Sequence, residues 1–167
     1  IIAVPMNYLV SKRIPNAETF LVHCERIKMK SRSVVFRQGE RSEDLYLILD
    51  GSVSVIVDDT EGPEQEMVVS YLNPGEFFGE MGLFIEEHRT ANLVTRTPCE
   101  FGRTSYQDFH AIRQQFSDVL YALTAQIWQR LKKYDPQACR SDVYRCLRTY
   151  SSVTHSAHHI ARGHDPP

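Results

Sequence analysis

Residues 73–91 read Asn-Pro-Gly-Glu-Phe-Phe-Gly-Glu-Met-Gly-Leu-Phe-Ile-Glu-Glu-His-Arg-Thr-Ala, and they carry most of the information about the fold. A Gly-Glu-Met-Gly turn comes first, a short acidic spacer follows, and Arg-Thr-Ala then opens an apolar run. We expect Gly79 and Gly82 to let the backbone curl, so that several N–H groups point into one concavity. Such a concavity suits an anion, although a glycine-rich turn between strands is usually only a turn.

The residues after this turn indicate what the anion belongs to. Arg89 supplies a rigid guanidinium fork, and the hydroxyl of Thr90 adds another donor. Glu80 is an acceptor beside an anion site, which makes sense if the ligand also carries a hydroxyl group. Because a phosphate together with a sugar hydroxyl defines a nucleotide, the stretch predicts a nucleotide site.

Short apolar runs separated by turns extend on both sides of this stretch, from about residue 27 to residue 107. We predict strands at 33–37, 45–49, 53–57, 67–72, 91–95 and 99–103. Asp50-Gly51 predicts a hairpin, and residues 58–65 a polar loop. Regular short strands with such turns are typical of a sandwich or a jelly-roll barrel. The predicted fold class is therefore mainly β with flanking α: an antiparallel jelly-roll β-barrel followed by a long C-terminal helix.

Helical patterns flank the strands. Residues 16–26 predict a short helix that Asn16 can cap, another helix begins near Ser105, and a longer one covers about 117–133. The long helix carries an apolar stripe that fits packing on the barrel or on a second copy of the chain. Its members are Val119, Leu120, Leu123, Ile127 and Leu131.

Taken together, residues 73–91 resemble the phosphate-binding cassette of the cyclic-nucleotide-binding domains. Residues 18–133 resemble more specifically the catabolite-activator (cAMP receptor protein) family of bacterial transcription regulators, including its early hairpins at 39–40, 45–48 and 51–53. The resemblance implies that Gly79 and Glu80 bind the ribose 2′-hydroxyl and neighbouring phosphate oxygens, while Arg89 and Thr90 grip the cyclic phosphate. The full implied ligand set is Gly79, Glu80, Met81, Arg89, Thr90, Ala91 and Arg130.

The resemblance also implies a ligand and a partner. Glu80, Arg89 and Thr90 favour cyclic AMP, and a related branch that responds to cyclic di-GMP is the alternative. Family members dimerise in parallel through the long helix, which implies a seam of Leu120, Leu123, Ile127 and Leu131 with a second copy. A ligand-free module that only dimerises stays open as a second hypothesis.

After Lys133 the resemblance stops, which divides the chain into a domain at 16–133 and a divergent tail at 134–167. Pro136 interrupts the helix, the adenine-facing hydroxyls of the family are missing, and no helix-turn-helix follows. Read one base out of frame, codons for 134–138 and 142–151 can encode Thr-Thr-Arg-Lys and Thr-Phe-Thr-Asp-Val-Tyr-Gly-Arg-Ile, which resemble the family's continuation. A frameshift is favoured over a natural tail, and DNA binding is expected only with the frame restored.

Net charge, hydropathy and cysteine spacing limit the classes of protein to which the chain can belong. With a net charge of −2, the chain has no global electrostatic reason to bind nucleic acid or anionic membrane. No apolar run approaches the roughly 20 residues that span a bilayer, and the four cysteines lack metal-ligand or redox spacing, so we expect a cytoplasmic protein. No catalytic constellation or favoured metal site emerges, although the tail histidines 155, 158 and 159 have ligand-like spacing. We therefore expect a binding protein rather than an enzyme.

Overall fold

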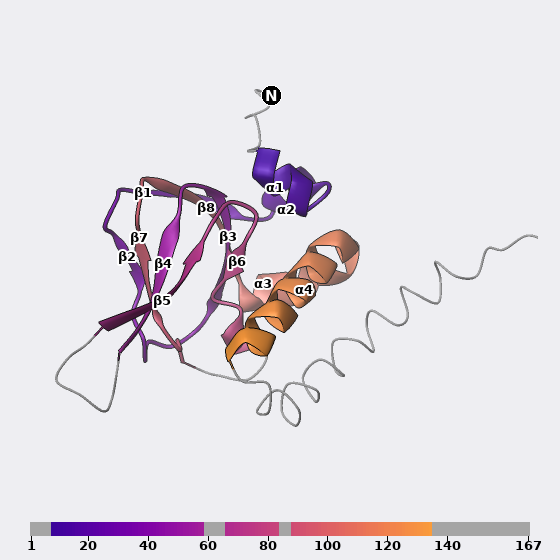
Figure 1. Ribbon diagram of the computed structural model, residues 1–167. Helices are drawn as coiled ribbons and strands as arrows, with labels where there is room; N and C mark the ends of the chain where they lie inside the picture. The colour runs from indigo at the N-terminus through magenta and orange to yellow at the C-terminus, as the bar shows by residue number, and fades with distance from the viewer. Residues whose placement is uncertain (1–7, 59–65, 84–87, 135–167) are drawn as a thin grey trace, which may run out of the picture.

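The computed structural model describes residues 8–58, 66–83 and 88–134, in which eight strands form two four-stranded antiparallel sheets (Figure 1). One sheet has the order β1-β8-β3-β6 and the other β2-β7-β4-β5. The predicted fold class, mainly antiparallel β with flanking helices, is confirmed. The strands are β1 (Glu25–Met29), β2 (Val34–Phe36), β3 (Asp44–Asp50), β4 (Val53–Asp58), β5 (Glu66–Leu72), β6 (Phe77–Phe78), β7 (Asn92–Thr95) and β8 (Cys99–Ser105).

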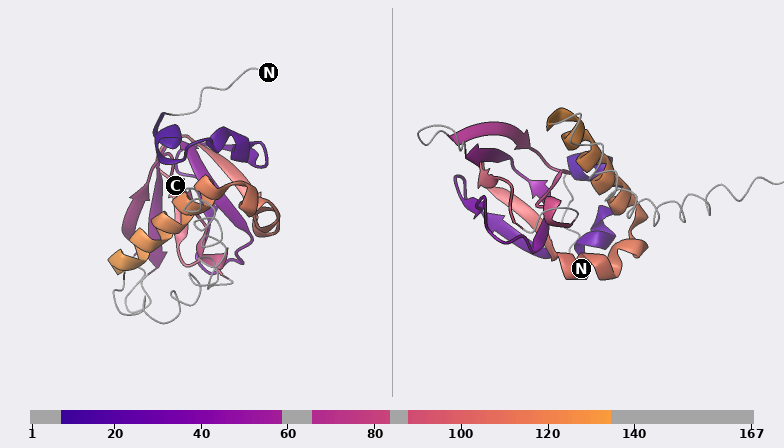
Figure 2. Two further views of the ribbon diagram at one scale, coloured as in Figure 1. Left: turned by 90° about the vertical axis from the view of Figure 1, so that its right-hand side faces the viewer. Right: turned by 90° about the horizontal axis from the view of Figure 1, so that it is seen from below.

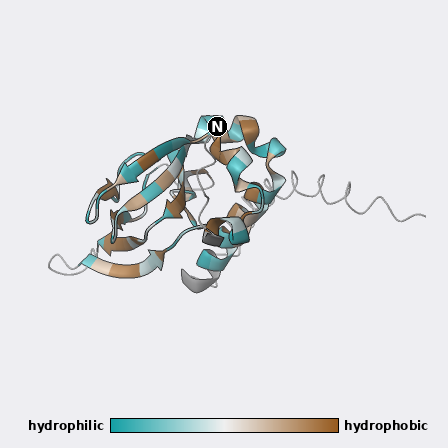
Figure 3. Ribbon diagram, turned by 90° about the horizontal axis from the view of Figure 1, so that it is seen from above, coloured by the Kyte–Doolittle hydropathy of each residue, from teal (hydrophilic) through white to brown (hydrophobic). Residues whose placement is uncertain are grey.

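Strand pairing follows the nested order of a jelly roll. β1 pairs with β8, β2 with β7, β3 with β6 and β4 with β5, so each strand of the first half meets its counterpart from the second half. The pairs β1–β8 and β3–β6 lie in one sheet, where β3 also pairs with β8. The pairs β2–β7 and β4–β5 lie in the other sheet, where β4 also pairs with β7. Hydrophilic and hydrophobic residues both occur along most strands, as expected for sheets with one face on a core (Figure 3).

The prediction of a hairpin at Asp50-Gly51 is wrong. The turn leads from β3 into β4, but these strands lie in different sheets, so it is a corner between the sheets. Gly51 has a φ of 86°, and a Cβ there would lie 2.6 Å from the Cys99 Sγ atom. The glycine is therefore required by both its backbone conformation and the close approach of the segment before β8.

The helices lie together on one side of the barrel (Figures 1 and 2). They are α1 (Tyr8–Arg13), α2 (Ala17–Leu21), α3 (Tyr106–Ile112), the 3₁₀ turns η1 (Met81–Leu83) and η2 (Arg113–Gln115), and α4 (Ser117–Tyr134). The helix predicted over 16–26 is shorter, because the chain enters β1 at Glu25. Asn16 has a φ of 58° and makes no side-chain cap bond, so its predicted capping role is wrong. No helix within the described ranges is long and apolar enough to cross a membrane.

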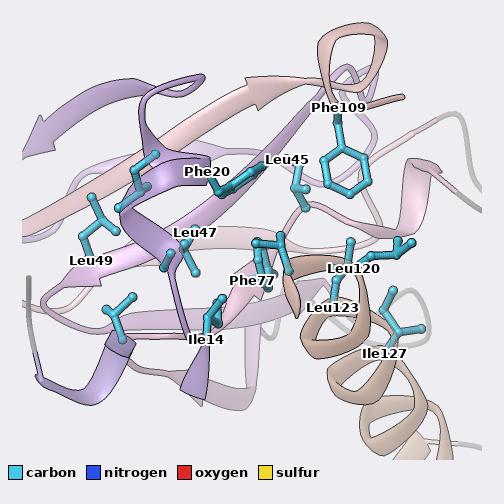
Figure 4. Packing of buried hydrophobic residues seen from close by; sticks show 14 residues of the cluster. Ile14, Phe20, Leu45, Leu47, Leu49, Phe77, Phe109, Leu120, Leu123 and Ile127 are labelled. Atoms are coloured by element: carbon cyan, nitrogen blue, oxygen red, sulfur yellow. The ribbon is translucent and has the colours of Figure 1, made fainter. Parts of the chain in front are cut away.

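Two hydrophobic clusters form the core. The barrel cluster lies between the sheets and is rich in aromatic rings; it includes Phe36, Tyr46, Ile48, Val53, Leu72, Phe78, Leu93 and Phe101. The helix cluster joins one sheet to the helices (Figure 4); it includes Val10, Ile14, Phe20, Leu45, Leu47, Phe77, Phe109, Leu120, Leu123 and Ile127. Helix α1, which the sequence did not predict, contributes Val10 to this second cluster.

The apolar stripe of α4 therefore faces its own barrel. Leu120, Leu123 and Ile127 are buried within the single chain and lie on the side of the helix towards Phe77 (Figure 4). Side chains already packed in the protomer cannot also form a seam, so their assignment to the dimer interface is wrong. The side chain of Leu131, the fourth predicted member, lies outside the described residues, as do residues 59–65 of the predicted polar loop and residues 135–167 of the tail.

Candidate nucleotide site

A cavity of about 360 Å³ opens between the β6–η1 segment, the start of β7 and one face of the β4–β5 pair. All seven residues predicted for ligand binding line it, although they come from three separate parts of the chain: Gly79, Glu80, Met81, Arg89, Thr90, Ala91 and Arg130. Its volume falls within the range of about 300–1,000 Å³ that is usual for small-molecule sites. The fold thus brings the predicted cassette and the α4 arginine to one place.

Arg89 is held at the end of this cavity that also contains Gly79, Glu80 and Arg130, called the polar end below. Its backbone N–H donates to the Glu40 carbonyl at 2.7 Å, and its own carbonyl accepts from the Gly39 N–H at 2.8 Å. The side chain is only 7% exposed, and its Cζ atom lies 4.0 Å from the centroid of the Phe36 ring. Its Nη1 donates to the Gly79 carbonyl at 3.1 Å. The Nε atom is buried and has no hydrogen-bond partner among the described residues, which leaves a donor unsatisfied.

The two glycines of the cassette have different functions. Gly79 has a φ of 75°, and a Cβ there would lie 2.6 Å from Arg89 Nη1. Its freedom to curl the backbone is therefore used as predicted. Gly82 has no positive φ, so the corresponding prediction is wrong for it. A Cβ at Gly82 would instead lie 2.7 Å from the Tyr106 hydroxyl, which shows that this glycine provides space.

Glu80, which is buried, forms an ion pair across the site with Arg130, which is half-buried. The Arg130 Nη1 atom donates to Glu80 Oε1 at 2.6 Å, and Glu80 is only 5% exposed. Arg130 Nη2 is buried and unpartnered among the described side chains. A buried carboxylate is costly without a partner, so Arg130 stabilises the acceptor that the sequence predicted for a ligand hydroxyl.

Helix α4 is tied to the cassette by a second residue that the sequence did not reveal. The Gln126 side chain accepts from the Phe77 N–H at 2.8 Å and donates to the Gly75 carbonyl at 2.9 Å. Gln126 lies one turn before Arg130, so both side chains reach the 75–80 segment from the same face of the helix. A glutamine in an amphipathic helix gives no sequence signal for such a contact.

Two further hydroxyl groups support the polar end and were also missed. Tyr106, the first residue of α3, donates to the Gly79 carbonyl and contacts the Ser42 hydroxyl. Its oxygen lies 3.4 Å from Arg89 Nη1. Burial raises the pKa of Tyr106 above its usual value, so the phenol keeps its proton at neutral pH. Neither residue belongs to the glycine-rich stretch, and only the fold brings them to it.

The opposite wall of the cavity is apolar. It is formed by side chains of β4 and β5 with contributions from β6 and β7: Val55, Val57, Met67, Val69, Leu72, Phe78 and Leu93. β5 is the edge strand of its sheet, and Met67 remains 59% exposed. The cavity therefore offers charge and hydrogen bonds at one end and a hydrophobic surface at the other.

A family model described as the cyclic nucleotide-binding domain matches residues 26–116, more than half of the chain. The chain belongs to the cyclic nucleotide-binding domain family. The matched range contains both sheets apart from the first residue of β1, and it includes every cavity residue named above except Arg130.

The relatives of this chain described next are named as transcription regulators. It is 44% identical over 119 residues to the cAMP-activated global transcriptional regulator CRP of Escherichia coli, covering 71% of this chain and 56% of the relative. It is 37% identical over 125 residues to the cAMP-activated regulator Vfr of Pseudomonas aeruginosa, covering 72% and 58% respectively. The chain thus spans a little over half the length of these relatives.

A regulator of known structure has the same fold as this chain but is named for another cyclic nucleotide. The c-di-GMP responsive global regulator CLP of Xanthomonas campestris superimposes with a TM-score of 0.64 at 37% identity, covering 74% of this chain and 62% of that chain. The relatives therefore include two regulators named as activated by cyclic AMP and one named as responsive to cyclic di-GMP.

Proposed function

We propose that this chain is the sensory part of a CRP-type regulator and that its cavity binds cyclic AMP. The cyclic phosphate would sit on Arg89 and Thr90, and the ribose 2′-hydroxyl would donate to Glu80. The base would lie against the apolar wall of β4 and β5. Ligand binding would alter the contacts of α4 with the cassette and thereby bias how α4 meets a second copy of the chain.

One observation carries this proposal: a buried arginine with an unsatisfied Nε–H lines the same cavity as a buried glutamate. An unpaired buried donor on a charged group is costly, and an anionic ligand would satisfy it. Such an arrangement is expected of a site that is completed by its ligand.

Two points favour a cyclic mononucleotide over cyclic di-GMP. Both curated relatives described above carry cyclic AMP in their names. Moreover, a cyclic dinucleotide has two phosphates, whereas one of the two cavity arginines, Arg130, is already paired with Glu80. Cyclic di-GMP remains the second candidate because the description of the CLP structure names it.

The proposed partner is a second copy that would meet the outer face of α4. With Leu120, Leu123 and Ile127 buried in the protomer, the residues left for a partner are those on the opposite side. Tyr121 is 69% exposed, and Ala125, one turn further along, is also exposed. An exposed aromatic ring next to a small residue suits the close approach of a second helix.

Calorimetric titration with cyclic AMP, cyclic GMP and cyclic di-GMP tests the ligand, with Arg89→Ala as the variant. Loss of a charge-assisted contact should weaken cyclic AMP binding by at least about 1.5–3 kcal/mol, or roughly 10- to 150-fold. Arg96→Ala is a matched control, because Arg96 is exposed and stacks on Tyr71 outside the cavity. Equal affinities of the wild type and Arg89→Ala would contradict the proposal.

A further inference from the structure

We infer that Tyr106 is a positioning residue of the nucleotide site: its hydroxyl fixes the Arg89 guanidinium and the Gly79 turn together before any ligand arrives. The inference rests on the proposed function and identifies which residue outside the glycine-rich cassette prepares the anion end. Tyr106 stands at the start of α3, 16 residues beyond Thr90 in sequence. No feature of the local sequence pattern marks it.

The hydrogen bonds at the Tyr106 oxygen have only one consistent arrangement. A phenol has one hydrogen to donate and can accept two hydrogen bonds. The Gly79 carbonyl can only accept, so the phenolic hydrogen goes to it. Ser42 must then donate to Tyr106, and Arg89 Nη1, at 3.4 Å, can only donate as well. The oxygen is thus used to its full capacity, which makes its position well defined.

This arrangement closes a small ring of contacts around the anion end. Arg89 Nη1 donates to the Gly79 carbonyl and to Tyr106, while Tyr106 donates to the same carbonyl. The guanidinium is planar, so two contacts at Nη1 and the Phe36 ring at 4.0 Å leave it little freedom to rotate. Its remaining donors are therefore held in one orientation beside the cavity that Arg89 lines, which lowers the entropic cost of binding an anion.

Gly82 provides independent evidence that the space around this hydroxyl is kept open. A Cβ on Gly82 would lie 2.7 Å from the Tyr106 oxygen and 2.7 Å from the Ser42 Cβ. Since Gly82 has no positive φ, conformational freedom does not explain a glycine at this position. The second glycine of the Gly-Glu-Met-Gly turn therefore makes room for the Ser42–Tyr106 pair.

Tyr106→Phe is the decisive variant, because it removes the hydroxyl and keeps the buried ring. Tyr71→Phe is the matched control, since Tyr71 is an exposed tyrosine outside the cavity. In calorimetric titrations with cyclic AMP, Tyr106→Phe should bind about three- to tenfold more weakly than the wild type, the usual effect of one neutral hydrogen bond. Ser42→Ala, which removes only the donor to Tyr106, should lose less, and Tyr71→Phe should match the wild type.

The arginine side-chain ¹⁵N–¹H spectrum of the ligand-free variants gives a readout that does not depend on binding. In Tyr106→Phe the Nε–H signal of Arg89, assigned by its loss in Arg89→Lys, should shift or broaden, whereas in Tyr71→Phe it should stay in place. Spectral changes limited to α3 backbone amides, with the Arg89 signal unmoved, would indicate a merely structural role and overturn the inference. Unchanged affinity in Tyr106→Phe, or equal losses in the two phenylalanine variants, would also overturn it.

The two proposals can fail separately. If the wild type binds none of the three cyclic nucleotides, the proposed function fails. The arginine spectrum alone then decides whether Tyr106 positions Arg89: a displaced signal in Tyr106→Phe supports that role, and an unmoved one refutes it.

Discussion

The two ends of the cavity are built in contrasting ways. At the polar end, Arg89 and Glu80 are almost completely buried and are held by contacts from separate segments of the chain, including α3 and α4. At the other end, side chains of β4 and of the edge strand β5 form an apolar wall that stays partly exposed. The polar end is therefore fixed before binding, whereas the wall offers hydrophobic area without directional contacts.

The difference has a physical reason. A buried charge must be satisfied by specific partners, so every charged group at the polar end brings its neighbours into a defined geometry. Burial of apolar surface is roughly proportional to area and has no preferred direction. The comparison leads us to expect that the polar end selects the cyclic phosphate and the ribose, and that the wall discriminates weakly among bases.

The largest loss of stability is expected when the ion pair between Glu80 and Arg130 at the polar end is removed. Arg130→Met should leave the Glu80 carboxylate buried without its partner and lower the free energy of unfolding by about 3 kcal/mol or more. Chemical denaturation of the ligand-free protein measures this. The double variant Glu80→Gln/Arg130→Met should recover much of the loss, because it removes the unpaired charge.

The pair formed by Arg26 and Glu100 provides a matched control. These side chains approach to 2.9 Å, but Arg26 is exposed and the Glu100 side chain is 23% exposed, against 6% for that of Glu80. Arg26→Met should therefore cost no more than about 1 kcal/mol. Equal losses for Arg26→Met and Arg130→Met would show that the polar end is not energetically distinct from the surface.

Glu80 should account for recognition of the ribose. The wild type should bind cyclic AMP more tightly than 2′-deoxy cyclic AMP by about 1–2 kcal/mol, since the missing hydroxyl leaves a charged acceptor unsatisfied. In Glu80→Gln this preference should shrink, as measured by competition titration with both ligands. Glu43→Gln, at an exposed residue outside the cavity, should keep the wild-type preference. If Glu80→Gln keeps the full preference for cyclic AMP over 2′-deoxy cyclic AMP, the ribose hydroxyl does not bind at Glu80.

A smaller effect is expected at the apolar wall. Val57→Ala removes two methyl groups from this wall and should weaken ligand binding by about 1 kcal/mol or less. The loss should be the same for cyclic AMP and cyclic GMP, because the wall has no directional contact to distinguish the bases. Val34→Ala, at an exposed valine outside the cavity, serves as the control. A loss for one base alone would refute the description of the wall as non-directional.

The smallest effect concerns pH. Burial raises the pKa of Tyr106, so its contribution is fully present below the usual phenol pKa and is lost only as pH rises towards the raised value. Cyclic AMP affinity should therefore stay constant to within roughly twofold between pH 7.5 and 9.5. A steep fall within this range would show that the hydroxyl loses its proton early and that the polar end is more exposed than the structure indicates.

Part of the polar end could be predicted from one short stretch of sequence. Gly79, Glu80 and Arg89 lie within eleven residues, and the structure places all three along one cavity. Ser42, Tyr106 and Gln126 could not be found in this way, because they reach the site only through sheet pairing and helix packing. Hydroxyl and amide side chains have no pattern that distinguishes such contacts from ordinary surface positions.

The errors in the predicted fold share a cause. Asp50-Gly51 has the composition of a hairpin turn, yet the partners of β3 and β4 are chosen by tertiary pairing with β8 and β5. The stripe of α4 fits the barrel or a second helix, and only the family resemblance favoured the second helix; the structure shows that Leu120, Leu123 and Ile127 pack on the barrel. Local patterns indicate that a face is buried but do not identify what covers it.

A crystal structure of the chain with bound cyclic AMP would show how the cavity holds the nucleotide. We expect a cyclic phosphate oxygen within hydrogen-bond distance of the Arg89 guanidinium, the 2′-hydroxyl at Glu80, and the base against Val57 and its neighbours on the apolar wall. A nucleotide bound with its phosphate away from Arg89, or an empty cavity at ligand concentrations that saturate the protein in solution, would contradict this expectation.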